Sequence, residues 1–157
     1  MLTIITGESG SGKTQKLLGL LDNSRAAGFS VSGIICPAVF DGGKKTGIDA
    51  LLLPGEERIR LADAGAGAHG LSWAFSDTAM EAVNAYFDAL CEPAAAERAT
   101  VTVIDEIGPL ELVHGGGFTS ALKLLDDIAY NDAIIVVRPS LLDVACKRWA
   151  VDAIDTL

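Results

Sequence analysis

One short segment near the N-terminus constrains the fold more than any other feature of the sequence. Residues 7–14 read Gly-Glu-Ser-Gly-Ser-Gly-Lys-Thr, which satisfies the pattern G-x-x-x-x-G-K-[ST]. The segment follows a β-branched run, Leu2–Thr6, and precedes Lys13–Ala27, where leucines recur at helical spacing. Because the backbone amides of such a loop converge at the N-terminus of the helix, this order of strand, loop and helix predicts a phosphate-binding loop.

The side chains of this loop have separate expected roles. Lys13 is expected to reach the β- and γ-phosphates of a nucleotide, and Thr14 to give its hydroxyl to Mg²⁺. The alternative is a glycine-rich turn with an exposed lysine, which would need neither the strand before it nor the helix after it. The predicted nucleotide-binding residues are Gly7, Glu8, Ser9, Gly10, Ser11, Gly12, Lys13 and Thr14.

Strands and helices alternate along the rest of the 157 residues. Strands are predicted at 2–6, 31–40, 46–53, 56–61, 72–75, 100–104, 133–137 and 151–154. Helices are predicted at 13–27, 77–90 with Asp77 as N-cap, 118–130 and 140–149, and loops at 62–70 and 93–99. A turn at Asp41-Gly42-Gly43 makes an antiparallel hairpin of the second and third strands. We therefore predict one α/β domain over residues 1–157, with a mainly parallel sheet flanked by helices and an inserted antiparallel hairpin.

A second segment, Val101–Glu106, is typical of a buried strand that carries a carboxylate to the metal side of a phosphate site. Asp105 is the expected metal ligand, together with Thr14. Glu106 stands directly after it and could orient and deprotonate a water in line with the γ-phosphate, so it is the predicted catalytic base. The alternative for Glu106 is a solvent-exposed glutamate at the start of a loop.

The sequence around the second segment resembles the cancer-related nucleoside-triphosphatases, small proteins in which this strand runs into D-E-I-G-x-x-E-L. Residues 105–112 read Asp-Glu-Ile-Gly-Pro-Leu-Glu-Leu. Ser32-Gly33-Ile34-Ile35, the hairpin at 42–48 and the order of elements along nearly the whole chain share the likeness. The resemblance implies a RecA-like P-loop NTPase fold and Mg²⁺-dependent hydrolysis of NTPs to NDPs with loose base selectivity, with Glu106 in the catalytic position.

Several positions bear on how far this resemblance extends. Pro109 stands where the family usually has a lysine, Lys45 where an arginine is usual, and Ala38 where a polar or acidic side chain is expected. Glu111 matches a family position, with either a structural or a catalytic role. Lys44 and Lys45 at the hairpin tip are expected to lie on a solvated turn, with a contribution to catalysis as the alternative.

Arg138 follows the predicted strand 133–137, which in RecA-like folds lies between the phosphate-loop strand and the strand of the metal ligand. An arginine there faces the γ-phosphate and could stabilise the charge of the transition state. A surface residue or an ion pair is the alternative. The predicted catalytic residues are Glu106, Lys13 and Arg138.

Charge and composition narrow the possible partners. Twelve basic and 21 acidic side chains give a formal net charge of −9, which disfavours binding to nucleic acid or an anionic membrane. The three cysteines have no disulfide or zinc spacing and indicate a reducing compartment, so we expect a cytoplasmic protein. His69 and His114 are expected to be ordinary loop or surface residues. The aromatic side chains of Trp73, Phe75, Tyr86 and Phe87 are expected in the core, with base stacking as the alternative.

Three hypotheses about function remain at this stage. The first is a Mg²⁺-dependent hydrolase that accepts ATP, GTP or another NTP. A small-molecule kinase is the second, although the sequence shows no arginine-rich lid segment. The third is a nucleotide-gated module that acts on an unknown protein partner. An N-K-x-D segment does not occur in the sequence, so selectivity for guanine is unsupported.

Overall fold

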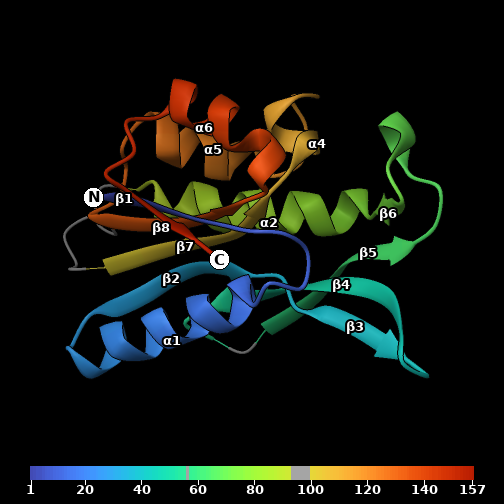
Figure 1. The fold of residues 1–157 in the computed structure, drawn as a ribbon, viewed down its shortest axis with the longest axis horizontal. Helices are drawn as coiled ribbons and strands as arrows, with labels where there is room; N and C mark the ends of the chain where they lie inside the picture. Colours follow the sequence, from blue (N-terminus) through green and yellow to red (C-terminus); the bar gives the residue numbers. More distant parts are fainter. Residues whose placement is uncertain (56, 93–99) are drawn as a thin grey trace.

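The computed structural model describes residues 1–55, 57–92 and 100–157. These residues form a mixed sheet of nine strands in the order β6-β5-β4-β2-β7-β8-β1-β9, with β3 paired to β4 (Figure 1). The expected strand at 56–61 begins outside the described residues, at Glu56, and the expected loop at 93–99 lies entirely outside them. The fold agrees with the α/β prediction and with an inserted antiparallel segment.

Five strands form the parallel half of the sheet. They are β2 (Ser30–Ile35), β7 (Thr100–Ile107), β8 (Asp132–Val137), β1 (Leu2–Thr6) and β9 (Ala153–Thr156). Strand β8 lies between β1 and β7, which confirms the strand order expected around Arg138. Because these strands are parallel, the carboxyl ends of β1, β7 and β8 lie at one edge of the sheet, where ligands bind in open α/β folds.

The antiparallel half consists of β3 (Ala38–Asp41), β4 (Lys44–Leu53), β5 (Glu57–Ala64) and β6 (Trp73–Phe75). The predicted hairpin is confirmed, with its turn at Gly42 and Gly43. The prediction of one strand over 31–40 is wrong, because Cys36 and Pro37 interrupt the strand and separate β2 from β3. Proline has no N–H for a sheet ladder, and the carbonyl of Pro37 instead accepts a hydrogen bond from Asp49 N. Strand β4 consequently pairs with both β2 and β3.

Helices cover both faces of the sheet (Figure 1). Helix α1 (Lys13–Ala26) packs on one face, and α2 (Asp77–Leu90), α5 (Thr119–Asp126) and α6 (Leu142–Arg148) lie on the other. Neighbouring strand residues alternate between the two cores: Ile4 belongs to the core beneath α2 and α5, and Ile5 to the core against α1. None of the helices in the described parts of the chain is long and apolar enough to cross a membrane.

Several predicted boundaries differ from the structure. Strand β5 continues to Ala64 and β7 to Ile107, and a short helix, α4 (Pro109–Leu112), follows β7. The helix expected at 118–130 ends at Asp126, after which Ile128 has a φ of 53°. Two 3₁₀ turns, η1 (Ala68–Gly70) and η2 (Pro139–Leu141), replace parts of the expected loop and helix. The N-cap of α2 is Ser76, whose Oγ accepts a hydrogen bond from Ala79 N, and not Asp77.

Gly33 explains why β2 carries the Ser-Gly-Ile-Ile sequence. Its φ is 102°, and a Cβ at this position would lie 1.9 Å from the carbonyl oxygen of Val103 on β7. Gly33 N donates a hydrogen bond of 2.7 Å to the hydroxyl of Tyr86, which itself donates to the carbonyl of Leu53 on β4. The glycine thus lets a side chain of α2 join β2 to β4 at the centre of the sheet.

Gly33→Ala is expected to lower the free energy of unfolding by about 3 kcal/mol or more, because the added methyl collides with buried backbone at a φ that alanine rarely adopts. The matched control is Gly19→Ala on α1, where a Cβ meets nothing within 4 Å and helix propensity predicts a gain of roughly 0.5–1 kcal/mol. Urea unfolding of both variants measures the difference. Equal stability of the two variants would contradict the close approach of β2 and β7.

Candidate active site

The glycine-rich loop joins β1 to α1 as its sequence predicts. Gly10 and Gly12 have φ values of 79° and 93°, which place them in the left-handed region, and Gly12 is the N-cap of α1. Within the loop, Ser11 N donates to the carbonyl of Glu8 at 3.1 Å. Glycine adopts these φ angles without steric cost, so the chain can curl around the helix N-terminus and leave that end open to an anion.

Lys13 is held against its own loop. Its Nζ donates hydrogen bonds of 2.7 Å to the carbonyl oxygens of Gly7 and Glu8. The ammonium group therefore lies beside the loop that it is expected to serve, and both of its recorded partners are neutral carbonyls. A phosphate oxygen can replace either carbonyl, and the bond is then stronger because the acceptor as well as the ammonium donor is charged.

An irregularity in β7 brings Asp105 and Glu106 to the same side. Pairing with β8 shifts register between Ile104 and Ile107, and Glu106 has a φ of 70°. In a regular strand residues three apart face opposite sides, yet Ile104 and Ile107 pack in the same core. The bulge therefore directs both carboxylates to the carboxyl edge of the sheet, and the prediction that the strand ends before Asp105 is wrong.

Asp105 is a buried carboxylate, with 4% of its surface exposed. Its Oδ2 accepts a hydrogen bond of 3.1 Å from Cys36 N at the break after β2. Loss of hydration raises the pKa of Asp105 from its ordinary 3.8 to about 6, although the bond from Cys36 opposes this shift. A hard cation would compensate the desolvated charge, and carboxylate and hydroxyl oxygens such as those of Asp105 and Thr14 suit Mg²⁺, so these residues fit the ion.

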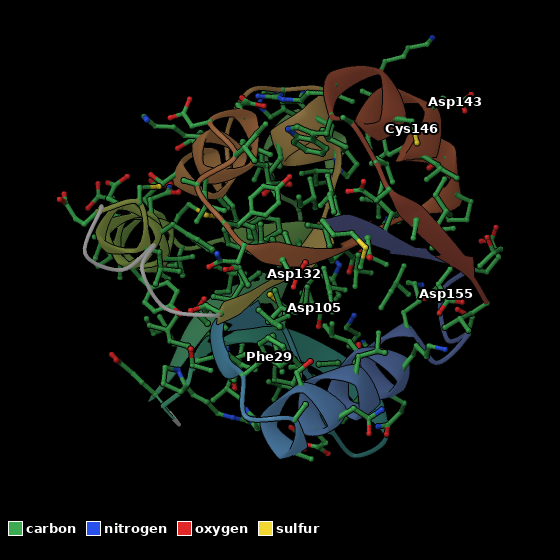
Figure 2. The ribbon with its side chains drawn as sticks, turned by 90° about the vertical axis from the view of Figure 1, so that its left-hand side faces the viewer. Phe29, Asp105, Asp132, Asp143, Cys146 and Asp155 are labelled. Atoms are coloured by element: carbon green, nitrogen blue, oxygen red, sulfur yellow. The ribbon has the colours of Figure 1, made fainter. Side chains whose placement is uncertain are left out.

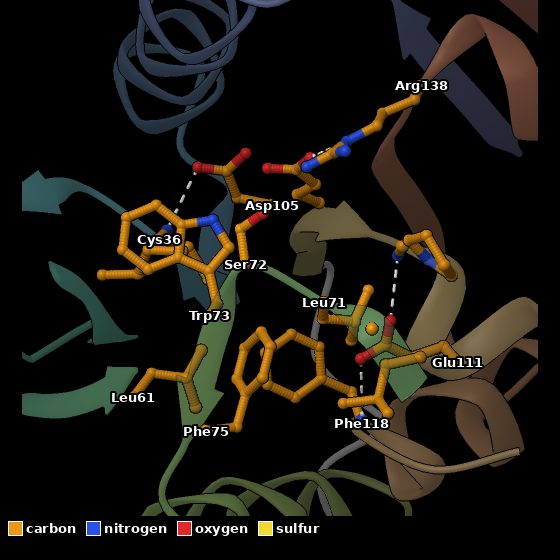
Figure 3. Close-up of a pocket in the computed structure, with 16 residues that line it drawn as sticks. Cys36, Leu61, Leu71, Ser72, Trp73, Phe75, Asp105, Glu111, Phe118 and Arg138 are labelled. Atoms are coloured by element: carbon orange, nitrogen blue, oxygen red, sulfur yellow. Dashed lines mark hydrogen bonds and ion pairs between the residues drawn. The ribbon is translucent and has the colours of Figure 1, made fainter. Parts of the chain in front are cut away.

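Glu106 is paired with Arg138, the first residue after β8. Arg138 Nε donates to Glu106 Oε1 at 2.6 Å, and both side chains are partly exposed at the edge of the sheet. Figure 3 shows the Arg138 side chain directed toward Asp105, with a dashed line for its ion pair with Glu106. The arginine is therefore close enough to contact either Glu106 or an anion that approaches it.

A cavity of about 610 Å³ connects these groups, and we call it the phosphate-loop cavity. It brings together all the predicted site residues except Ser11: Gly7, Glu8, Ser9, Gly10, Gly12, Lys13, Thr14, Asp105, Glu106 and Arg138. Asp155 of β9, at the edge of the sheet (Figure 2), fixes the start of α1 through an ion pair of 2.9 Å with Lys16. The sheet edge, the loop and the first turn of α1 thus form one site.

The sequence did not identify every residue at this site. Lys45, expected on a solvated turn, lines the phosphate-loop cavity and lies 4.9 Å from the ring centroid of Trp73. Phe87 is fully buried as predicted, whereas Trp73 and Phe75 are half-buried and line a second cavity. The signal that could have indicated this arrangement is the hairpin itself, because β4 turns back across the carboxyl end of β2.

Glu111 has a structural position. Its two carboxylate oxygens accept hydrogen bonds from Gly108 N at 2.9 Å and Phe118 N at 3.2 Å, so the side chain joins the start of α4 to the start of α5. Burial raises the pKa of Glu111, and the hydrogen bonds from the two amides oppose this. The side chain holds the loop that follows Glu106, which favours the structural interpretation.

Comparison with known proteins identifies a matching family and several relatives. The model of the family described as NTPase matches residues 3–141. The nucleoside-triphosphatase THEP1 of Methanopyrus kandleri is 31% identical over 155 residues, which cover 92% of this chain and 80% of that protein. The corresponding protein of Sulfurisphaera tokodaii is 32% identical over 133 residues, covering 85% and 73% of the two chains.

A solved structure supports the same fold. The solution structure of a human cancer-related nucleoside triphosphatase superposes with a TM-score of 0.68, covering 98% of this chain and 87% of the other at 20% identity. At this identity the likeness concerns the fold, and the sequence matches above carry the evidence for the family.

Asp105→Asn is expected to stabilise the protein when divalent ions are chelated. Because the pKa of Asp105 is raised in the folded protein, the protonated side chain stabilises the fold fully below about pH 4. This stabilisation is lost as the pH rises through about 6, and the loss reaches about 3 kcal/mol. Asparagine keeps the acceptor for Cys36 N but has no charge to bury. Urea unfolding should show the advantage of the variant growing from pH 5 to pH 8.

The control for this measurement is Asp88→Asn, which changes an exposed carboxylate on α2. It should leave the pH dependence of stability close to wild type. An advantage of Asp105→Asn that is constant from pH 5 to pH 8 would contradict the desolvation of Asp105.

Proposed function

This chain belongs to the NTPase family, the nucleoside-triphosphatases with a phosphate-binding loop, and we propose that it hydrolyses NTPs to NDPs and phosphate in a Mg²⁺-dependent reaction. The observation that carries the proposal is the bulge in β7. It directs two consecutive carboxylates, Asp105 and Glu106, into the phosphate-loop cavity, so one can serve the metal while the other serves water. A site that only binds nucleotide has no need for the second carboxylate.

We assign nucleotide binding to residues 7–14. The amides between Gly7 and Gly12 surround the phosphates at the start of α1, and Lys13 leaves the carbonyls of its own loop to contact the β- and γ-phosphates. Both groups are shared by every NTP. The sequence offers no guanine-reading motif, so the proposal includes loose base selectivity.

Thr14 and Asp105 are the residues proposed to hold Mg²⁺. When bound, the ion would neutralise charge on the β- and γ-phosphates and orient them. The raised pKa of Asp105 supports this role, because a carboxylate that is costly to ionise alone is stabilised when a cation is bound beside it. The hydrogen bond from Cys36 N fixes the carboxylate before the ion arrives.

Glu106 is the proposed general base. Its carboxylate accepts the proton of a water that attacks the γ-phosphorus, and Arg138 orients that carboxylate through the bond to Oε1. Because Arg138 also lines the phosphate-loop cavity, we propose that it contacts the transferring phosphoryl group as negative charge develops. Arg138 and Glu106 are both exposed, so Arg138 can exchange its 2.6 Å contact with Glu106 for one with a phosphate without disturbing the hydrophobic core.

We further propose that the protein is a single cytoplasmic domain and that it binds neither nucleic acid nor anionic membranes. The residues described here share one sheet, which favours a single domain over residues 1–157. Three free thiols favour a reducing compartment such as the cytoplasm. The net charge of −9 disfavours nucleic acid and anionic membranes as partners.

Glu106→Gln is expected to lower the turnover number by roughly 10²–10⁴ and to change the affinity for Mg²⁺·NTP only a few-fold. Glutamine keeps the shape and the hydrogen bond to Arg138 but cannot take a proton. Phosphate release and calorimetric titration measure the two quantities. The comparison variant is Lys13→Ala, which should lose binding as well as turnover while its circular dichroism stays that of a folded protein.

Hydrolysis by Glu106→Gln at the wild-type rate would overturn the role of this residue. Unchanged nucleotide affinity in a folded Lys13→Ala protein would overturn the phosphate-loop assignment. Glu106→Gln is expected to lose turnover but not binding, and Lys13→Ala to lose both, so each assignment is tested separately.

The specificity constants for ATP, GTP, CTP and UTP are expected to agree within about a hundredfold, or 2.7 kcal/mol of transition-state discrimination. The physical reason is that the assigned contacts involve phosphates and metal, which the four nucleotides share. Steady-state phosphate release with each NTP gives the values. A larger preference would require a base-reading pocket elsewhere in the chain.

A further inference from the structure

A second cavity adjoins the phosphate-loop cavity, and we call it the aromatic cavity. Its volume is about 240 Å³, and its apolar lining includes Leu61, Leu71, Trp73, Phe75 and Phe118, which Figure 3 labels, together with Ile48. These side chains come from β4, β5, β6, the segment just before β6 and the start of α5, so the inserted antiparallel segment supplies most of them. The hydrolysis proposed above gives this cavity no role.

The two cavities meet at the catalytic carboxylates. Cys36, Asp105, Glu106 and Arg138 line both of them. A molecule in the aromatic cavity would therefore face the end of a nucleotide held by the phosphate loop, with Glu106 at the boundary. A second substrate in the aromatic cavity would therefore lie next to a γ-phosphoryl group held by the phosphate loop.

The size and polarity of the aromatic cavity favour an organic occupant over water. One water takes roughly 30 Å³ and needs several polar partners, and the six wall residues named above are apolar. Polar groups gather at the other end: Figure 3 shows Asp105 and Arg138 above the ring of Trp73, Ser72 beside it, and Phe75 and Phe118 below, and Glu106 is paired with Arg138. The cavity thus suits a molecule with an apolar body and one hydroxyl group directed at Glu106.

Charge restricts the occupant further. Among the described residues that line the aromatic cavity, Arg138 is the only lysine or arginine, and it is paired with Glu106. Glu106, Asp105 and Glu111 are carboxyl groups in the same wall. An anionic acceptor, such as a nucleoside monophosphate, would face these carboxyl groups. Lys45 lies 4.9 Å from the ring centroid of Trp73 but lines the phosphate-loop cavity and not this one, so the aromatic cavity favours an uncharged ligand.

We propose that the aromatic cavity binds a small uncharged alcohol with an aromatic or cyclic body, and that this alcohol accepts the γ-phosphoryl group of the NTP. The inference rests on the nucleotide site proposed above. The hydroxyl oxygen forms a bond to the γ-phosphorus, and the bond from that phosphorus to the β–γ bridging oxygen breaks. The hydroxyl proton passes to the carboxylate of Glu106, and the bridging electrons leave with the NDP. The products are an NDP and a phosphate monoester.

The test uses benzyl alcohol, phenol and cyclohexylmethanol as probes, each with ATP and Mg²⁺, and ³¹P NMR to separate inorganic phosphate from phosphate ester. Glycerol is the control acceptor, because it has hydroxyl groups but no apolar body. The wild-type protein should form a phosphate ester with at least one of the three ring alcohols, in an amount that rises and saturates with its concentration, and none with glycerol. Phosphate release should fall in proportion as the ester forms.

Two variants connect the ester to the cavity. Phe75→Ala removes part of the apolar wall, and Leu71→Trp fills the space; each should lower ester formation about tenfold or more. The matched control is Phe29→Ala, because Phe29 is exposed and directly precedes β2, so it lies at the amino ends of the parallel strands and not at their carboxyl ends. It should form as much ester as wild type. Residual phosphate release shows that a variant is folded, and each of the two cavity variants is informative if the other fails to fold.

The outcomes separate this inference from the proposed function. Phosphate release without ester from any of the three ring alcohols would overturn the acceptor site and leave hydrolysis standing. Equal ester formation with glycerol, or in both cavity variants, would also overturn it. If neither phosphate nor ester appears with the wild-type protein, both the proposed function and this inference fail.

Discussion

The candidate active site depends on one local departure from β-strand geometry. A regular strand alternates its side chains, so consecutive carboxylates at its end would point to opposite faces of the sheet. The bulge between Ile104 and Ile107, with Glu106 at a φ of 70°, cancels this alternation for one residue. A non-glycine residue at such an angle costs about 1–3 kcal/mol, and here it places Asp105 and Glu106 side by side.

Three contacts with the surrounding structure hold this bulge in place. Ile107 pairs with Val137 and returns to the core after the irregularity. The break at Cys36-Pro37 leaves Cys36 N free to bond Asp105, and Arg138 at the end of β8 contacts Glu106. Each of these contacts comes from the last residue of a strand adjacent to β7 or from the residue that follows such a strand, so the strand order β2-β7-β8-β1 is what brings the phosphate loop and both carboxylates to one edge.

The sequence predicts the parts of the site that depend on local patterns. The glycine-rich loop, the β-branched strand that precedes Asp105 and the position of β8 follow from spacing, strand chemistry and the family resemblance, and the structure contains all three. Other features depend on contacts between distant segments. The bulge at Glu106 depends on the pairing of β7 with β8. The cavity-lining position of Lys45 and the second cavity beside Trp73 arise where β4 and β6 fold back across the carboxyl edge. Periodicity along one segment cannot indicate such contacts, so Trp73 was expected in the core.

We propose that the bulge gives the two carboxylates separate roles, with Asp105 binding the metal and Glu106 contacting the attacking water. A crystal structure of the protein with Mg²⁺, an NDP and aluminium fluoride tests it most directly, because this complex imitates the γ-phosphoryl group in transfer. The account predicts Thr14 and Asp105 on the metal side, Glu106 still at a positive φ, and its carboxylate about 2.6–3.2 Å from the water opposite the leaving oxygen. A structure in which Glu106 points away from that water, and another side chain holds it, would contradict the account.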